Sequence, residues 1–275
     1  MKKFNLLTTL ICFAGLLNAA SHIQPLAGEK KGWNISTANA VYQLRLSEEG
    51  TIYPSFWGTK AQMEQTAEQD RRRHNGPFFL QEVPVRGLHA DKLPGIEAIF
   101  ADGTRDCELM LTGTEVIDID GRATLKITQK DKYYPLEVIS YLRVLPEYDM
   151  IEKWIEVKNT GKKAKESILI ENLLSGSLYL SPDRYYLNHH SGQWLKEFQL
   201  RKTELTTGIK TLQARDFYAF QNTPWFAITN EADNDKENAE VWFGQVHYSG
   251  NWKLDFEVTH SNHLQIVGGI NFWDT

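Results

Sequence analysis

The sequence predicts an all-β protein folded as a large antiparallel β-sandwich. Segments in which apolar, β-branched and aromatic residues alternate with polar ones recur from Ile35 to the end of the chain, and turn residues separate them. No strand–helix alternation of the kind that builds parallel sheets is present. About a dozen strand candidates, with no Pro/Ser-rich linker or internal repeat, favour one two-sheet sandwich, and two smaller sandwiches are the alternative.

The strand candidates follow one another along the chain, and most are closed by a turn. In order they are Val41–Leu46, Gly95–Phe100 with the turn Ala101–Gly103, Val116–Gly121, Leu125–Thr128, Leu136–Val144, and Ile151–Lys158 with the turn Asn159–Gly161. Lys60–Arg72 lacks Gly and Pro and therefore fits a helix, but it has no strong apolar stripe and a loop is the alternative. Near the end, Gln213–Ile228 and Val241–Leu254 read as two strands, and Gly269–Thr275 as the start of a third element.

The first twenty residues have the pattern of a signal peptide. Lys2 and Lys3 precede an apolar run from Phe4 to Leu17, and Ala19-Ala20 offers small residues for cleavage before Ser21. The run is too short to span a bilayer, which takes about 20 apolar residues. We therefore expect residues 1–20 to be removed, residues 21–275 to form one domain, and the product to be periplasmic or secreted without a membrane contact.

Charge and cysteine content exclude several classes of function. The net charge of −5 becomes about −7 once Lys2 and Lys3 are removed, which argues against a nucleic-acid partner. Cys107 would be the one cysteine left, so we expect a buried, unpaired thiol and no disulfide. His189 and His190 are strand neighbours that point to opposite faces and cannot share a metal. No metal or cofactor is predicted.

Three segments carry a resemblance to a known family. Tyr248–Trp252 and Gly269–Trp273 resemble the Y-S-G-N-F and G-I-N-P-F segments of the amino-terminal domain of glycoside hydrolase family 36, the α-galactosidases. His189–Glu197 resembles that domain's H-x-x-G-x-W-x-x-E strand. The resemblance covers nearly the whole mature chain. It implies a β-supersandwich that ends where the family's catalytic barrel begins.

The resemblance also implies candidate substrate-binding residues. Asp70 matches an Asp that, in tetrameric family members, reaches a neighbouring subunit's active site. Those members also have an Arg further along the same loop, and Arg72 is the candidate substitute for it here. Trp57 lies in a segment resembling Y-Y/W-G-K, and Trp194 could stack on a sugar ring. The alternatives are a surface salt bridge at Asp70 and a core position for Trp194. Because it has few apolar anchors, the segment from Trp57 to Gly76 is expected to project from the sandwich.

No catalytic residue is predicted in this chain. Retaining glycosidases use two carboxylates about 5–5.5 Å apart, and the resemblance places both on the barrel. We expect the amino-terminal domain of an exported α-galactosidase, which braces the barrel, shapes the sugar site and oligomer, and is inactive alone. Its partners would be α-galactosides and a second copy of itself. The alternatives are a stand-alone carbohydrate-binding sandwich or an unstable fragment, and whether the gene product is truncated stays open.

Overall fold

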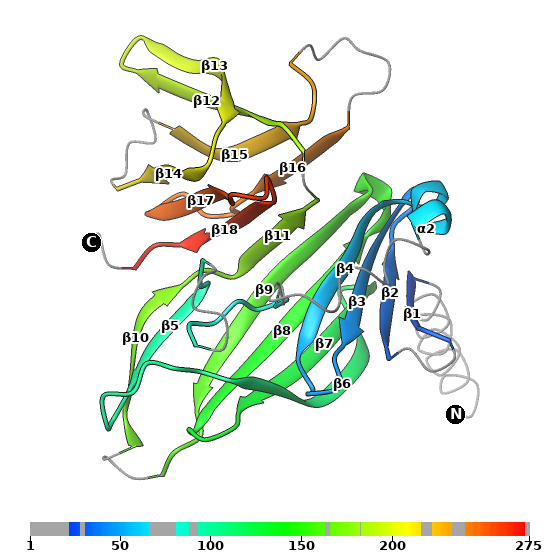
Figure 1. The fold of residues 1–275 in the computed structure, drawn as a ribbon, viewed down its shortest axis with the longest axis vertical. Coiled ribbons are helices and arrows are strands. Elements are labelled where there is room, and N and C mark those ends of the chain that lie inside the picture. The colour runs from blue at the N-terminus through cyan, green and yellow to red at the C-terminus, as the bar shows by residue number, and fades with distance from the viewer. Residues whose placement is uncertain are drawn as a thin grey trace, which may run out of the picture. The chain divides into compact units, whose positions relative to one another are not determined.

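The computed structural model describes residues 22–27, 31–66, 81–87, 93–162, 166–181, 183–215, 222–232 and 240–272. Strands dominate these ranges and pair antiparallel, which confirms the all-β prediction (Figure 1). The chain forms two compact units. The first unit comprises Met1–His89 with Phe100–Ile168, and the second comprises Ala90–Ile99 with Leu169–Thr275.

The first unit contains two four-stranded antiparallel sheets with the orders β1-β2-β3-β4 and β6-β7-β8-β9. Their strands are β1 Ile23–Pro25, β2 Gly32–Ser36, β3 Ala40–Leu46, β4 Ile52–Thr59, β6 Leu109–Ile119, β7 Arg122–Asp131, β8 Leu136–Leu145 and β9 Met150–Asn159. The two clearest strand patterns of the sequence are thus confirmed as β8 and β9.

A single apolar cluster lies between the two sheets of the first unit. Alternation along β7 sends Ala123, Leu125 and Ile127 to one face, where they join Leu142 of β8 and Leu44 of β3. All five are buried. Burying a side chain of this size stabilises the fold by about 1.5–3 kcal/mol, so this cluster holds the unit together.

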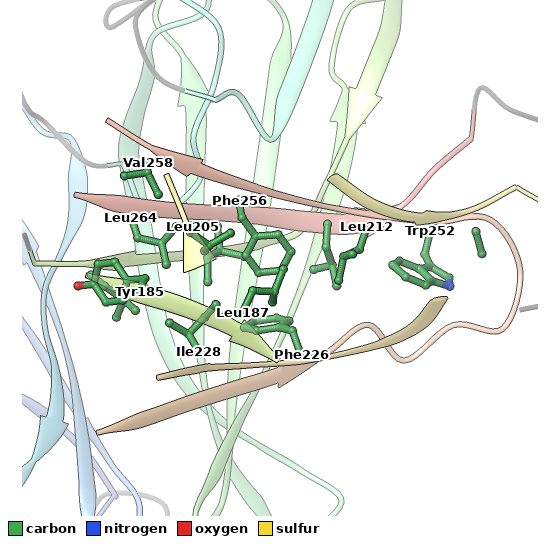
Figure 2. Close-up of a cluster of buried hydrophobic side chains, with 14 residues drawn as sticks. Tyr185, Leu187, Leu205, Leu212, Phe226, Ile228, Trp252, Phe256, Val258 and Leu264 are labelled. Carbon is green, nitrogen blue, oxygen red and sulfur yellow. The ribbon is translucent and has the colours of Figure 1, made fainter. Parts of the chain in front are cut away.

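The second unit also contains two four-stranded antiparallel sheets, in the orders β11-β18-β17-β14 and β13-β12-β15-β16. Their strands are β11 Gly176–Leu180, β12 Tyr185–Gln193, β13 Lys196–Leu205, β14 Gly208–Ala214, β15 Asn222–Thr229, β16 Val241–Gln245, β17 Trp252–Val258 and β18 Leu264–Ile270. Figure 2 shows Leu187, Phe226 and Phe256 among the side chains of their shared core. The rings of Phe226 and Phe256 meet edge to face with centroids 5.2 Å apart.

A segment from early in the chain completes the second unit. β5 (Ile96–Phe100) pairs with β10 (Ile168–Leu173). Just before β5, the backbone N–H of Leu93 donates to Gln265 Oε1 at 3.1 Å, and Gln265 Nε2 donates back to the Leu93 carbonyl at 2.8 Å. Because Gln265 is buried on β18, this reciprocal pair ties two segments 172 positions apart.

Within the described ranges, helical structure is limited to short pieces. The α-helix α2 (Lys60–Thr66) begins with a capping box. Gln62 N–H donates to Thr59 Oγ1 at 3.3 Å, and Thr59 N–H donates to Gln62 Oε1 at 2.8 Å. A single 3₁₀ turn, η2 (Pro146–Tyr148), joins β8 to β9. Within the described ranges, no helix is both long and apolar enough to cross a bilayer.

The structure corrects three expectations near the end of the chain. Val241–Leu254 is not one strand, since β16 ends at Gln245 and β17 begins at Trp252 in the other sheet. Gln213–Ile228 is not one strand, since β14 ends at Ala214 and β15 begins at Asn222. The two strands belong to different sheets, so the chain must leave one sheet and enter the other. Gly269-Ile270 does not start a new element either. Both residues end β18, where Gly269 pairs with Lys253 and Ile270 with Trp252.

Candidate functional site

Trp57 lies on β4 in the first unit and packs against the core. It is paired with Tyr42 of β3, and the two rings meet edge to face with centroids 5.4 Å apart. Trp57 is half-buried against the apolar cluster between the sheets. The prediction that the chain projects from Trp57 onward is therefore wrong for residues 57–66, which form the end of β4 and helix α2. Pairing with β3 holds residues 57–59, and the hydrogen bonds between Thr59 and Gln62 cap the helix that follows.

A buried carboxylate lies beneath Tyr42. Glu82 is 2% exposed and accepts a hydrogen bond from the Tyr42 hydroxyl. Lys153 Nζ of β9 lies 2.6 Å from Glu82 Oε1 and 5.6 Å from the centroid of the Tyr42 ring. Since a buried charge is tolerated only when it is paired, this group fixes Glu82. The backbone N–H of Glu82 also donates to the Ile52 carbonyl at 2.9 Å.

Described residues flank the segment that carries two of the candidate residues. Helix α2 leads into it at Thr66, and the chain beyond it is held at Glu82. Asp70 and Arg72 themselves lie outside the described residues. Their contact with substrate stays a prediction.

Trp194 occupies the turn of the β12–β13 hairpin in the second unit. Trp194 is 70% exposed, and its neighbour Leu195 is 80% exposed. Trp194 therefore does not fill the core. Leu195 adopts the left-handed conformation at φ 66°, and its N–H donates to Glu197 Oε1 at 3.0 Å. A Cβ on Gly192 would lie 2.6 Å from the Lys196 carbonyl oxygen. The turn therefore requires glycine at position 192.

Next to this hairpin lies an aromatic patch formed by His190, Phe198 and Trp225. His190 of β12 stacks on Trp225 of β15 with ring centroids 5.1 Å apart at 28°. Phe198 of β13 meets the His190 ring edge-on at 6.4 Å and is exposed. Sugars present apolar C–H faces against which such rings pack, and aromatic faces supply large contact area. The patch was not predicted, because β12 and β15 are far apart in sequence and only their pairing brings the rings together.

The two neighbouring histidines lie on opposite faces of β12, as predicted. His189 is buried on the inner face, and His190 belongs to the outer aromatic patch. The pKa of His189 is lowered, mainly because the ring is buried. The positive charges of Lys210 and Arg201 lower it further. Among the described residues, no three His, Cys, Asp or Glu side chains are grouped so that they could hold a metal ion.

Trp57 and Trp194 thus belong to different units, each with its own core. The first carries a tryptophan that packs on Tyr42, whose hydroxyl donates to the buried Glu82. The second carries an exposed tryptophan hairpin beside an aromatic patch. These surfaces suit contacts with a sugar or with another protein surface, and they are the candidate functional regions of the described chain.

Comparison with known proteins identifies the class. The sequence model of the Glycosyl hydrolase family 36 N-terminal domain matches residues 50–275, and the chain belongs to this family. Alpha-galactosidase AgaA of Geobacillus stearothermophilus is 21% identical over 273 residues, a match covering 90% of this chain and 37% of AgaA. The chain therefore spans little more than a third of the length of that relative.

Solved structures share the fold. The crystal structure of the alpha-galactosidase from Lactobacillus brevis matches with a TM-score of 0.80 at 19% identity, over 90% of this chain and 37% of that one. A variant of AgaA in complex with stachyose matches with a TM-score of 0.78 at 20% identity, over 88% and 37%. At these identities the likeness shows the fold.

Proposed function

We propose that this chain acts as the amino-terminal domain of an exported α-galactosidase in carbohydrate metabolism. In the complete enzyme it would brace the catalytic barrel, shape the rim of the sugar site and contribute to a homo-oligomer. Membership of the family over residues 50–275 carries this proposal. The substrate class, terminal α-galactosides, is supported by the stachyose complex of AgaA.

The surface of the second unit supports a role beside another domain. Phe198, Leu200 and Phe243 are exposed apolar side chains on strands of one sheet, together with the Trp194 hairpin. Contiguous exposed apolar surface marks sites of interaction with a protein or a ligand. A covering domain would remove this surface from water and would stabilise both partners.

Hydrolysis needs a nucleophile and a proton donor, and we place both on the barrel. The purified chain should therefore show no turnover of an aryl α-galactoside above the buffer rate. Turnover that survives the substitution Trp194→Ala would contradict this, because it would reveal a site elsewhere in the chain.

A second candidate is a stand-alone carbohydrate-binding sandwich, and the 70% exposure of Trp194 favours it. Titration of the chain with raffinose or stachyose, followed by tryptophan fluorescence, separates the two. Saturable binding that Trp194→Ala abolishes, and that the matched change Leu200→Ala preserves, would favour the stand-alone role. Absence of binding by the isolated chain would favour the role within a larger enzyme.

Export is part of the proposal and has its own test. The chain recovered from the periplasm or medium of an expressing cell should begin at Ser21 by mass spectrometry. Replacing Lys2 and Lys3 by Glu should retain the precursor inside the cell, because the positive n-region is needed. A recovered chain that still begins at Met1 would overturn the assignment.

A further inference from the structure

His189 is a buried polar residue whose inward ring nitrogen has no partner. Along β12, Tyr185 and Leu187 belong to the core of the second unit, and alternation places His189 on the same inner face. His189 is 5% exposed, and in the described part of the chain its Nδ1 has no hydrogen-bond partner. A buried polar atom without a hydrogen bond destabilises the fold, so a ligand that pairs with it would be favoured.

Two cations flank this ring at an open side of the sandwich. Arg201 of β13 lies directly opposite His189 in the antiparallel register, and such partners share one face. Lys210 of β14 lies two residues before the core residue Leu212. Strand alternation therefore places both on the same face, toward the space between the sheets. β13 and β14 are the edge strands of the two sheets, and two residues join them. The three side chains therefore gather along one edge.

Both cations are exposed on their strands. Arg201 Nε donates to Ser191 Oγ at 3.2 Å, and among the described residues neither Arg201 nor Lys210 forms an ion pair. Neighbouring carboxylates are engaged elsewhere, since Glu204 pairs with Arg184 at 2.7 Å and Asp255 pairs with Lys253 at 3.0 Å. Burial lowers the pKa of His189 most, and the positive charges of Lys210 and Arg201 are among the further causes.

We propose that the edge between β13 and β14 binds an oxyanion, held by Arg201 and Lys210 and by the Nδ1–H of His189. A guanidinium can donate two parallel hydrogen bonds to a carboxylate, sulfate or phosphate, and an ammonium adds a point charge. Inward charges at a sheet edge also prevent edge-to-edge pairing. That role alone leaves the buried His189 nitrogen unexplained, whereas a bound oxyanion accounts for all three side chains.

Isothermal titration of the purified chain with sulfate, phosphate and galacturonate tests this, with neutral galactose as the reference. Arg201→Gln and Lys210→Gln should each weaken binding about tenfold or more, consistent with the loss of a charge-assisted hydrogen bond. Lys196→Gln removes the same charge from the same strand away from the site and should leave affinity within about twofold. Tighter binding of galacturonate would identify an acidic sugar as the ligand, and binding of the inorganic ions alone would identify a free anion.

Two further measurements separate the site from a purely structural histidine. Histidine NMR should show the pKa of His189 rising when the anion binds, because a nearby negative charge stabilises the imidazolium. His189→Leu should melt no lower than the parent without anion, since the orphan atom is gone, and should lose the sulfate-dependent rise in melting temperature. The proposal is overturned if no anion binds or if neither Arg201→Gln nor Lys210→Gln weakens binding. Failure here leaves the proposed role in an α-galactosidase untouched, since that role is tested with neutral galactosides.

Discussion

Glu82 links the two sheets of the first unit. Its partners come from both sheets, Tyr42 from β3 and Lys153 from β9. These contacts hold the buried Glu82 against strands of both sheets. No local pattern predicts such a group, because its three members are separated by 40 and 71 positions along the sequence.

Glu82→Gln should lower the free energy of unfolding by about 2–4 kcal/mol, because it leaves Lys153 partly buried without its counter-charge. Urea denaturation followed by circular dichroism measures this. The matched change Glu147→Gln breaks the exposed pair with Arg122 and should cost at most about 1 kcal/mol. Equal effects of the two substitutions would show that the buried pair contributes no more than a surface one.

Cys107 is 3% exposed and has no disulfide, as the sequence predicts. Burial, and then the negative charge of Asp131, raise the pKa of its thiol far above the ordinary value. Labelling by a disulfide reagent requires the thiolate. We therefore expect the folded protein to react orders of magnitude more slowly than the same protein in denaturant. Prompt labelling at neutral pH would contradict the buried position.

At the level of elements, Asp149 joins the turns of two different sheets. It follows η2 between β8 and β9, and its carboxylate accepts hydrogen bonds from the Thr37 hydroxyl and from the Asn39 N–H, the latter at 3.0 Å. Thr37 and Asn39 form the turn between β2 and β3. The Thr37 hydroxyl, followed by the Asn39 N–H, lowers the pKa of Asp149.

The pKa of a carboxyl in the unfolded chain is near 3.9. A carboxyl whose pKa is lower than this in the folded protein stabilises the folded state at pH values above about 3.9. That stabilisation is lost as the pH falls through the folded-state pKa. Asp149→Asn should therefore cost about 1 kcal/mol at pH 7, and the cost should shrink as the pH drops below about 4. Asn tolerates the left-handed backbone of this position, φ 56°. Asp118→Asn, in an exposed hairpin turn, is the control. A pH-independent cost would argue against the carboxylate link.

Strands whose signal is local were predictable, and contacts between distant strands were not. β8 and β9 alternate strongly over ten residues each, and the turn Ala101–Gly103 is present, with Gly103 at φ 86°. The exposure of Trp194 depends on where the β12–β13 hairpin turns. The packing of Trp57 depends on the β3–β4 register. The stacking of His190 on Trp225 depends on the pairing of β12 with β15, two strands far apart in sequence.

The whole described chain consists of two units, each with its own apolar cluster. The first is built on residues such as Leu142, and the second on residues such as Phe256. Two separate cores give each unit its own source of stability. The sequence suggested one large sandwich and left two smaller ones as the alternative.

Thermal unfolding should therefore resolve two transitions, one for each core. Leu142→Ala should lower the first unit's transition by about 2–5 kcal/mol, and Phe256→Ala the second unit's by about 3–5 kcal/mol, each leaving the other transition in place. Calorimetry of the two variants and the parent measures this. A single transition that both substitutions shift equally would show that the units unfold as one.

The reciprocal bond between Leu93 and Gln265 has a consequence for how the chain is made. Ribosomes synthesise a chain from its N-terminus at about 5–20 residues per second. The segment before β5 therefore leaves the ribosome roughly 10–30 seconds before its partner on β18. During that interval the strands β6 to β9 can already pair, because their contacts are between sequence neighbours. The second unit cannot close until β18 has been synthesised. Until then its edge strands stay unpaired, which makes them prone to aggregate and dependent on a chaperone.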